Sequence, residues 1–357
     1  MPPHSAAFKI EKSDCYLVFA EREFGPETSK TANLLLRYRP ELIGTVVDST
    51  SAGRNSSDIL GSGYGEVPIV RSVEDGMECN PTHLVIGIAP TGGQLPESWR
   101  EFILRGIKNG LHVVSGLHEY LSDDDEFSTL AEEHEVEIFD LRKPPAIHHV
   151  SEGKWRDRSV PVVQTIGSDS AVGKLTGAWE LKRQLEKRGY QAELVATGQT
   201  GILLNGSGVV IDALKGDFMS ATVEKLIDEA IRENPDIILV EGQGSIYHEA
   251  YSGVTLAILH GAMPDSFLFM HRPGLTRNDY GFKLPPIRDM LNDYETFVEW
   301  FKPANILGIG LDTSKYESDT AESMCREIEH ITGITATDLV RFPQSEAVDE
   351  MIEKLHL

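Results

Sequence analysis

Short apolar runs recur along the chain, and most of them are followed by a longer segment with helical spacing of its apolar positions. In the N-terminal part the predicted strands are Cys15–Ala20, Ile43–Val47, Val67–Val70, His83–Ala89, Leu111–Ser115 and Val136–Phe139. Helices are expected over Thr28–Tyr38, Pro96–Asn109 and Asp124–His134. Strands that alternate with helices are typical of a parallel sheet covered on both faces.

A second series of the same kind follows residue 150. Its predicted strands are Val160–Ile166, Glu193–Thr197, Asp236–Val240, Phe267–Met270, Ile306–Leu311 and Ala336–Phe342. The segment between the two series is rich in proline and charge, as linkers are. We therefore predict an α/β protein with two doubly wound parallel-sheet domains, a Rossmann-like domain over 1–150 and a P-loop NTPase-like domain over 151–357.

The first domain lacks the glycine pattern of a dinucleotide site. Its first strand runs into EREFGPETSK, where Gly25 is the only glycine, and the later GSGYGE precedes a weak strand and is typical of a turn. The segment APTGGQLP lies past the carboxyl end of a strand, where open parallel sheets bind ligands. Gly92 and Gly93 would let a ligand approach there, and a flexible turn is an equal alternative.

The strongest chemical signal is a predicted phosphate-binding loop between a strand and an amphipathic helix. The sequence IGSDSAVGKLT provides a turn whose backbone N–H groups converge on an anion at the start of a helix. Lys174 would reach the outer phosphates. The expected ligand-binding residues are Gly167, Ser168, Ser170, Ala171, Val172, Gly173, Lys174, Leu175 and Thr176.

This loop departs from the common pattern in two ways. Five residues separate its glycines where four are usual, and Leu175 takes the place of the Ser or Thr that normally holds magnesium, with Thr176 one position late. Binding of a phosphorylated ligand is therefore better supported than its hydrolysis.

Two carboxylates are candidate catalytic groups. The strand DIILV ends at Glu241, at the carboxyl edge of the sheet, where a general base or a magnesium–water site belongs. A helix-capping role is the alternative. Asp169, inside the loop, is the second candidate base, and backbone N–H groups near Gly198 or Gly242 are candidates for an oxyanion site.

The candidate substrate-binding residues follow later strands. Arg272 lies in the strand-end HRPG, Arg277 in the polar loop Thr276–Asp289, and Gln199 in the strand-end TGQTG. Arginine is the residue best suited to bind carboxylates. A solvated loop is nearly as good an interpretation of the segment around Arg277.

Composition excludes several classes of partner. With 56 acidic and 33 basic residues the formal charge is −23, so nucleic acid and anionic membranes are poor partners. No apolar run approaches the ~20 residues of a membrane helix, and the N-terminus lacks the layout of a signal peptide, so a cytoplasmic protein is expected. Neither an HExxH nor a GxSxG pattern occurs, and no metal site is predicted.

Several ordered motifs resemble known families. IGSDSAVGKLT with the later VEGQGS resembles the dethiobiotin synthetase branch of P-loop proteins. APTGGQLP, FDLRKPP, SDSAVGKLT, ATGQTG, LVEGQGS and HRPG, which cover nearly the whole chain, look like the two-domain family that includes the D-glutamate N-acetyltransferases. This resemblance implies acetyl transfer from acetyl-CoA to the amine of an acidic amino acid, D-glutamate first among them. A homo-oligomer is also expected.

Two other functions stay open at this point. One is an ATP-dependent ligase of the dethiobiotin synthetase kind, in which Lys174 and Glu241 would serve ATP and Mg²⁺. The other is a nucleotide-sensing protein without catalysis, whose Rossmann-like half binds a regulator. Acetyl-CoA fits the loop, because coenzyme A carries a pyrophosphate and a 3′-phosphate that can be bound without hydrolysis.

Overall fold

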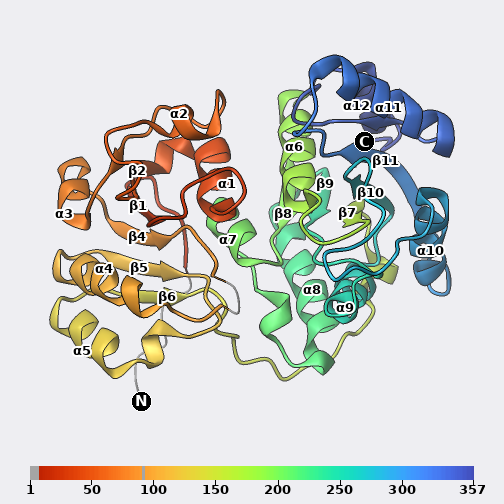
Figure 1. The fold of residues 1–357 in the computed structure, drawn as a ribbon. Helices are drawn as coiled ribbons and strands as arrows, with labels where there is room; N and C mark the ends of the chain where they lie inside the picture. Colours follow the sequence, from red (N-terminus) through yellow and green to blue (C-terminus); the bar gives the residue numbers. More distant parts are fainter. Residues whose placement is uncertain (1–7, 91–92) are drawn as a thin grey trace. The chain divides into compact units, whose positions relative to one another are not determined.

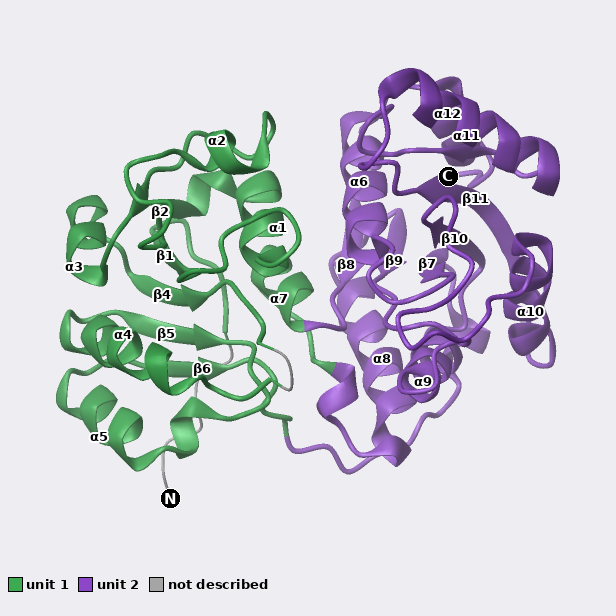
Figure 2. Cartoon of the chain, viewed as in Figure 1, with its two compact units in different colours: residues 1–145, 199–210 green, residues 146–198, 211–357 purple. Residues whose placement is uncertain are grey.

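The computed structural model describes residues 8–90 and 93–357, which form two compact units (Figure 1, Figure 2). Unit 1 contains residues 1–145 and 199–210, and unit 2 contains residues 146–198 and 211–357. Each unit has one six-stranded parallel sheet with helices. The predicted α/β class with a Rossmann-like and a P-loop domain is confirmed.

Unit 1 has the strand order β3-β2-β1-β4-β5-β6. Successive strands are added on one side of β1 up to β3 and on its other side from β4 onward, and β1 and β4 run parallel. Its strands are β1 Tyr16–Phe19, β2 Ile43–Val47, β3 Ile69–Val70, β4 His83–Ile86, β5 His112–Ser115 and β6 Ile138–Asp140. Its α-helices are α1 Lys30–Tyr38, α2 Ser56–Leu60, α3 Val73–Gly76, α4 Glu97–Lys108, α5 Asp125–Glu133 and α7 Gln199–Asn205. Trp99 of α4 packs edge-on against Phe19 of β1, with ring centroids 5.3 Å apart.

Unit 2 has the strand order β12-β11-β10-β7-β9-β8. Its strands are β7 Val162–Gly167, β8 Ala192–Val195, β9 Ile237–Val240, β10 Ser266–His271, β11 Asn305–Leu311 and β12 Ala336–Thr337. Its α-helices are α6 Lys174–Lys187, α8 Gly216–Ile231, α9 Ser252–Ala262, α10 Ile287–Glu299, α11 Ser318–Thr332 and α12 Glu346–Glu353. The central strand β7 carries the phosphate loop at its carboxyl end.

The sheet of unit 2 is covered on both faces because strand side chains alternate. Phe267 and Phe269 of β10 pack against Tyr294 of α10, with ring centroids 6.3 and 6.1 Å apart. Met270, the next residue, faces the other way and packs against Gly177 of α6. A Cβ at Gly177 would lie 2.5 Å from the Met270 sulfur, so the absence of a side chain there lets α6 approach the sheet.

The division into units differs from the sequence-based one at two places: residues 146–150 belong to unit 2, and the segment 199–210 belongs to unit 1. Its helix α7 buries Ile202, Leu203 and Leu204. The Thr200 hydroxyl lies 2.8 Å from the Thr31 hydroxyl of α1. A short helix with one apolar run carries no signal that tells which of two sheets it joins.

The predicted strand Ala336–Phe342 is shorter in the structure. β12 ends at Thr337 because the Asp338 carboxylate accepts hydrogen bonds from the backbone N–H groups of Val340 and Arg341, both 3.0 Å long. This local side-chain pattern turns the chain and competes with strand pairing.

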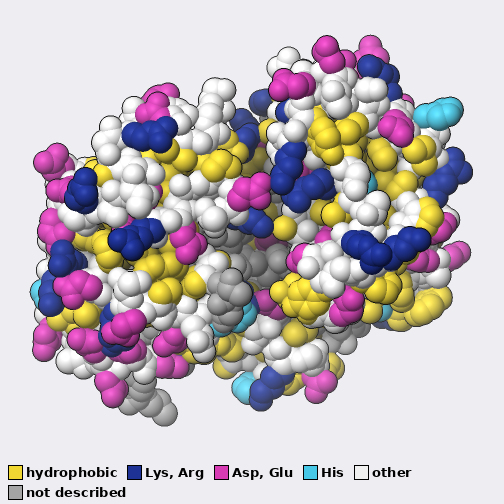
Figure 3. Space-filling view, in the orientation of Figure 1, with side chains coloured by type: hydrophobic (Ala, Val, Ile, Leu, Met, Phe, Trp, Pro, Cys, Tyr) yellow, Lys and Arg dark blue, Asp and Glu magenta, His cyan; other side chains and the backbone are white. Residues whose placement is uncertain are grey.

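Acidic side chains are spread over the visible face of each unit and do not gather in one patch (Figure 3). None of the helices in residues 8–90 and 93–357 has both the length and the apolar character needed to cross a membrane.

Candidate functional site

The loop after β7 has the backbone of an anion-binding turn. Ala171 and Gly173 adopt left-handed conformations, with φ of +49° and +94°, and α6 begins at Lys174. Within the described part of the chain, the N–H groups of Ala171 and Gly173 donate no hydrogen bond. The buried hydroxyl of Ser170 also has no partner among those residues. The loop therefore presents unpaired donors at a helix N-terminus, as an anion site requires.

Neighbouring strands and helices hold this loop in place. Tyr294 of α10 donates to the Gly167 carbonyl at 2.9 Å, and the Ser245 hydroxyl donates to the Ser168 carbonyl at 3.2 Å. The Ser168 hydroxyl lies 2.9 Å from Nδ1 of His271. Burial lowers the pKa of His271 to about 4, so this imidazole is neutral. These three contacts at the start of the loop therefore come from groups that carry no charge.

Lys174 and Glu241 form the buried charged centre of the site. Lys174 is 7% exposed, and its Nζ donates to the Asp169 carbonyl at 2.7 Å. Burial lowers its pKa to about 8, against the opposing attraction of Asp169 and Glu241. Burial also raises the pKa of Glu241 to about 7, although Oε2 accepts from the N–H groups of Thr197 and Gly198 at 2.9 and 3.2 Å. A carboxyl with this pKa can exchange a proton near neutral pH.

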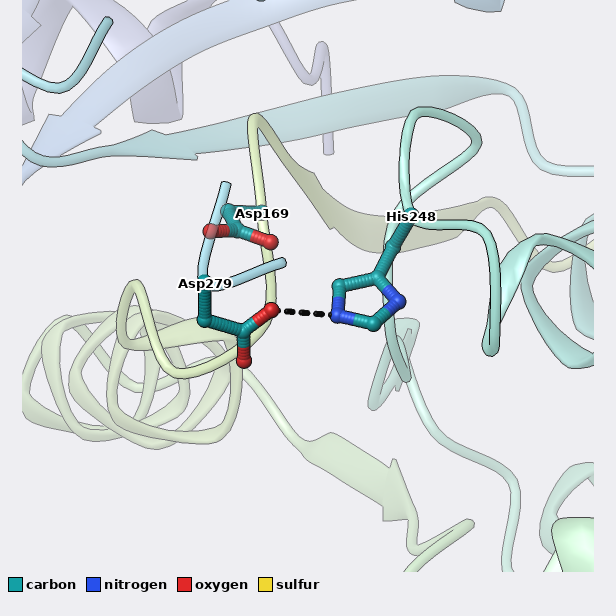
Figure 4. Close-up of side chains that lie close together, drawn as sticks. All are labelled: Asp169, His248 and Asp279. Carbon is teal, nitrogen blue, oxygen red and sulfur yellow. Dashed lines mark hydrogen bonds and ion pairs between the residues drawn. The ribbon is translucent and has the colours of Figure 1, made fainter. Parts of the chain in front are cut away.

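A second cluster joins the loop to two segments far away in the sequence (Figure 4). The carboxylates of Asp169 and Asp279 and the imidazole of His248 have ligand atoms within 4.8 Å of one another. Nε2 of His248 lies 2.5 Å from Oδ1 of Asp279. Burial, together with the charge of Asp279, raises the pKa of Asp169.

The structure brings together only part of the set predicted from the sequence. Arg272 lies beside the loop, where it donates to the Ala171 carbonyl at 3.1 Å and pairs with Asp312 at 2.9 Å. Arg277 is exposed and donates to the Gly281 carbonyl. Gln199 belongs to unit 1, where its side chain accepts from Arg142 at 3.3 Å. Leu175 and Thr176 occupy the first turn of α6 and are half-buried.

The candidate oxyanion donors are engaged elsewhere. The N–H of Gly242 donates to the Thr165 hydroxyl at 2.9 Å, and the N–H of Gly198 donates to Glu241. The amides of Gly198 and Gly242 themselves are therefore not available to a ligand, and an oxyanion site formed by amides near them stays a prediction. Each of these amides is hydrogen-bonded to a side chain from a neighbouring strand or strand end, and the linear sequence does not reveal such partners.

Sequence reasoning missed His248 and Asp279 as site residues. His248 lies in the loop between β9 and α9, and Asp279 lies in the polar loop before α10, which was singled out for its basic residues. Residues 91 and 92 of the segment APTGGQLP lie outside the described residues, so the expectation for Gly92 is not addressed.

Unit 2 also has a cavity that is separate from this site. Its volume is about 320 Å³, and it is lined by residues such as Lys154, Trp155 and Glu224. The Glu224 carboxylate already accepts from Ser151 and from the N–H groups of Glu152 and Gly153. The cavity lies near the start of β7, whereas ligands of open α/β sheets bind at the carboxyl ends of the strands.

Fold and loop define the class: a two-domain α/β protein with a Rossmann-like unit and a P-loop unit. Comparison with known families agrees. Residues 149–348 match the P-loop domain, and residues 49–144 the Rossmann-like domain, of DUF1611, a domain of unknown function. The chain belongs to the DUF1611 family.

Two relatives carry a more specific name. A D-glutamate N-acetyltransferase of Tritonibacter scottomollicae is 32% identical over 286 residues, which are 78% of this chain and 84% of the relative. Another of that name from a Pseudoalteromonas species is 32% identical over 274 residues, 76% of this chain and 80% of the relative. The crystal structure of a DUF1611 protein from Anabaena variabilis is 33% identical, with a TM-score of 0.90 over 96% of this chain and all of that one.

Proposed function

We propose that the protein transfers an acetyl group from acetyl-CoA to the amine of an acidic amino acid, with D-glutamate as the first candidate. The observation that carries this proposal is the 32% identity to two D-glutamate N-acetyltransferases over three quarters of the chain. The loop geometry is compatible with it, because unpaired amides and Lys174 provide an anion site while Leu175 replaces the usual magnesium-binding hydroxyl.

In this proposal the loop binds the phosphates of acetyl-CoA. The N–H groups of Ala171 and Gly173, the Ser170 hydroxyl and the Lys174 ammonium are the donors available to them. The pantetheine arm separates these phosphates from the thioester. The arm therefore has to turn back along the carboxyl edge of the sheet for the acetyl group to reach Glu241 or Asp169.

The reaction requires a general base. The substrate amine is an ammonium ion at neutral pH and must lose one proton before its nitrogen can attack the thioester carbonyl. The C–N bond forms, the C–S bond breaks, and the nitrogen loses its second proton as the coenzyme A thiolate gains one, so that one proton is released overall. Glu241, whose pKa is about 7, is the first candidate for the base, and Asp169 is the second.

Arginine side chains are the proposed partners of the substrate's carboxylates. Arg277 is exposed, and its guanidinium donates to the backbone carbonyl of Gly281. Arg272 is anchored by Asp312 and by the loop, so it would act from a fixed position.

The decisive experiment measures release of free thiol from acetyl-CoA with a panel of D- and L-amino acids, with and without ATP and Mg²⁺. Acetylation of D-glutamate that needs neither ATP nor Mg²⁺ is expected. Product formation that depends on ATP would favour a ligase and refute the proposal, and so would the absence of turnover with every amino acid.

A further inference from the structure

The cluster of Asp169, His248 and Asp279 has a defined protonation pattern. Nδ1 of His248 accepts from the Ala250 N–H at 3.2 Å, so in the neutral ring the proton sits on Nε2. Nε2 then donates to Asp279. The ring is fully buried and stacks on Tyr251 at 4.3 Å between centroids, which keeps it in this orientation.

This pattern argues against a metal ion. A ligating imidazole needs a free lone pair on the nitrogen that faces the metal, whereas Nε2 of His248 carries a proton. Two carboxylates remain, which is few for a divalent ion that prefers six or more oxygen ligands. They are nevertheless two negative charges close together, one of them buried, and such a pair favours a cation that can donate several hydrogen bonds.

We propose that Asp169 and Asp279, the latter oriented by His248, bind the ammonium group of the amino-acid substrate. A primary ammonium donates three hydrogen bonds, and carboxylate oxygens accept them. Asp169 is 4% exposed and the side chain of Asp279 is 56% exposed, so the subsite is open on one side to an entering ligand.

Positions along the loop place this cation subsite next to the proposed phosphate site of acetyl-CoA. The carbonyl of Asp169 accepts a hydrogen bond from Nζ of Lys174, while the carboxylate of the same residue belongs to the cluster. A cation subsite and an anion site therefore share one residue. This inference rests on the proposed function, in which Asp169 would hold the amine and Glu241 would take its proton.

The test compares ligands with and without the amine. D-Glutamate and glutarate carry the same two carboxylates, and only the first has an ammonium group. Asp279→Asn keeps an oxygen that accepts from His248 and removes the charge. Asp289→Asn, an exposed position in the first turn of α10, makes the same charge change outside the cluster and is the matched control.

In Asp279→Asn we expect the KM for D-glutamate to rise about tenfold, with the KM for acetyl-CoA unchanged. Calorimetry should show that Asp279→Asn prefers D-glutamate over glutarate by about tenfold less than the wild-type protein does. The control Asp289→Asn should keep the wild-type preference. Equal weakening of both ligands, or no change in either, would overturn the subsite.

Failure of the proposed function gives a different result. If the wild-type protein releases no thiol, the calorimetric comparison still decides the subsite, because it needs no turnover. Wild-type binding of glutarate as tight as that of D-glutamate would overturn the subsite even if acetyl transfer occurs. Asp169→Asn, checked by retained acetyl-CoA binding, should reproduce the loss of preference.

Discussion

Replacing Lys174 tests whether the loop binds the donor. Its side chain is 7% exposed, and its pKa of about 8 leaves about nine-tenths of it charged at pH 7. A hydrogen bond to a charged group contributes about 1.5–3 kcal/mol, and little of this is lost to solvent at a buried position. We therefore expect Lys174→Ala to raise the KM for acetyl-CoA by about 10- to 150-fold.

The assay is the initial rate of thiol release at pH 7 with varied acetyl-CoA and saturating D-glutamate. Lys174→Met, which keeps most of the stem and loses the charge, should match the alanine variant if charge is the cause. Turnover should also fall, because Glu241 loses the nearby positive charge that lowers its pKa. An unchanged KM for acetyl-CoA would refute the loop assignment. A rise in the KM for D-glutamate alone would place the substrate's carboxylate on the loop.

The same residue predicts a pH effect. Lys174 loses its charge as the pH rises through about 8, so the KM of the wild-type protein for acetyl-CoA should increase above that pH. The methionine variant has no charge to lose and should lack this increase. A wild-type KM that stays flat from pH 7 to about pH 10, near the ordinary lysine pKa, would contradict a role of the ammonium in donor binding.

Further predictions concern the neighbouring strand ends and the surface. Glu241→Gln should abolish turnover with acetyl-CoA binding retained, and a wild-type rate would remove Glu241 as the base. Because the pKa of Glu241 is raised from 4.5 to about 7, its contribution to the free energy of unfolding is full below pH 4.5 and lost as the pH rises through 7. In chemical denaturation, the free energy of unfolding of the glutamine variant should lack this decline. Gly242→Ala should lower the free energy of unfolding by about 3 kcal/mol or more, since a Cβ there would lie 1.8 Å from the Thr165 carbonyl oxygen. Gly253 in α9 has open space around it, so Gly253→Ala should unfold like the wild-type protein in the same denaturant series. With a net charge of −23, the melting temperature should rise between about 10 mM and 1 M salt, and a constant value would show that self-repulsion is unimportant.

The sequence by itself determined the parallel α/β class and the loop. Each of the twelve predicted strands overlaps a strand of the structure, because apolar runs and their spacing are local properties of the chain. The loop from Gly167 to Lys174 was predictable for the same reason: strand, turn and helix start lie within a few consecutive residues. Helices α2, α3, α7, α9 and α10 were not predicted. Of these, α9 lies in a segment that is apolar nearly all round, where helical periodicity is weak.

Only the tertiary structure decided which distant side chains meet. His248 and Asp279 reach Asp169 from loops about 80 and 110 positions further along the chain, because the sheet order places β10 and β9 on either side of β7. Tertiary contacts also decide that the amides of Gly198 and Gly242 are already hydrogen-bonded to Glu241 and to Thr165. They likewise place Gln199 in unit 1. Such contacts depend on the order and register of the strands, which local patterns of polarity do not encode.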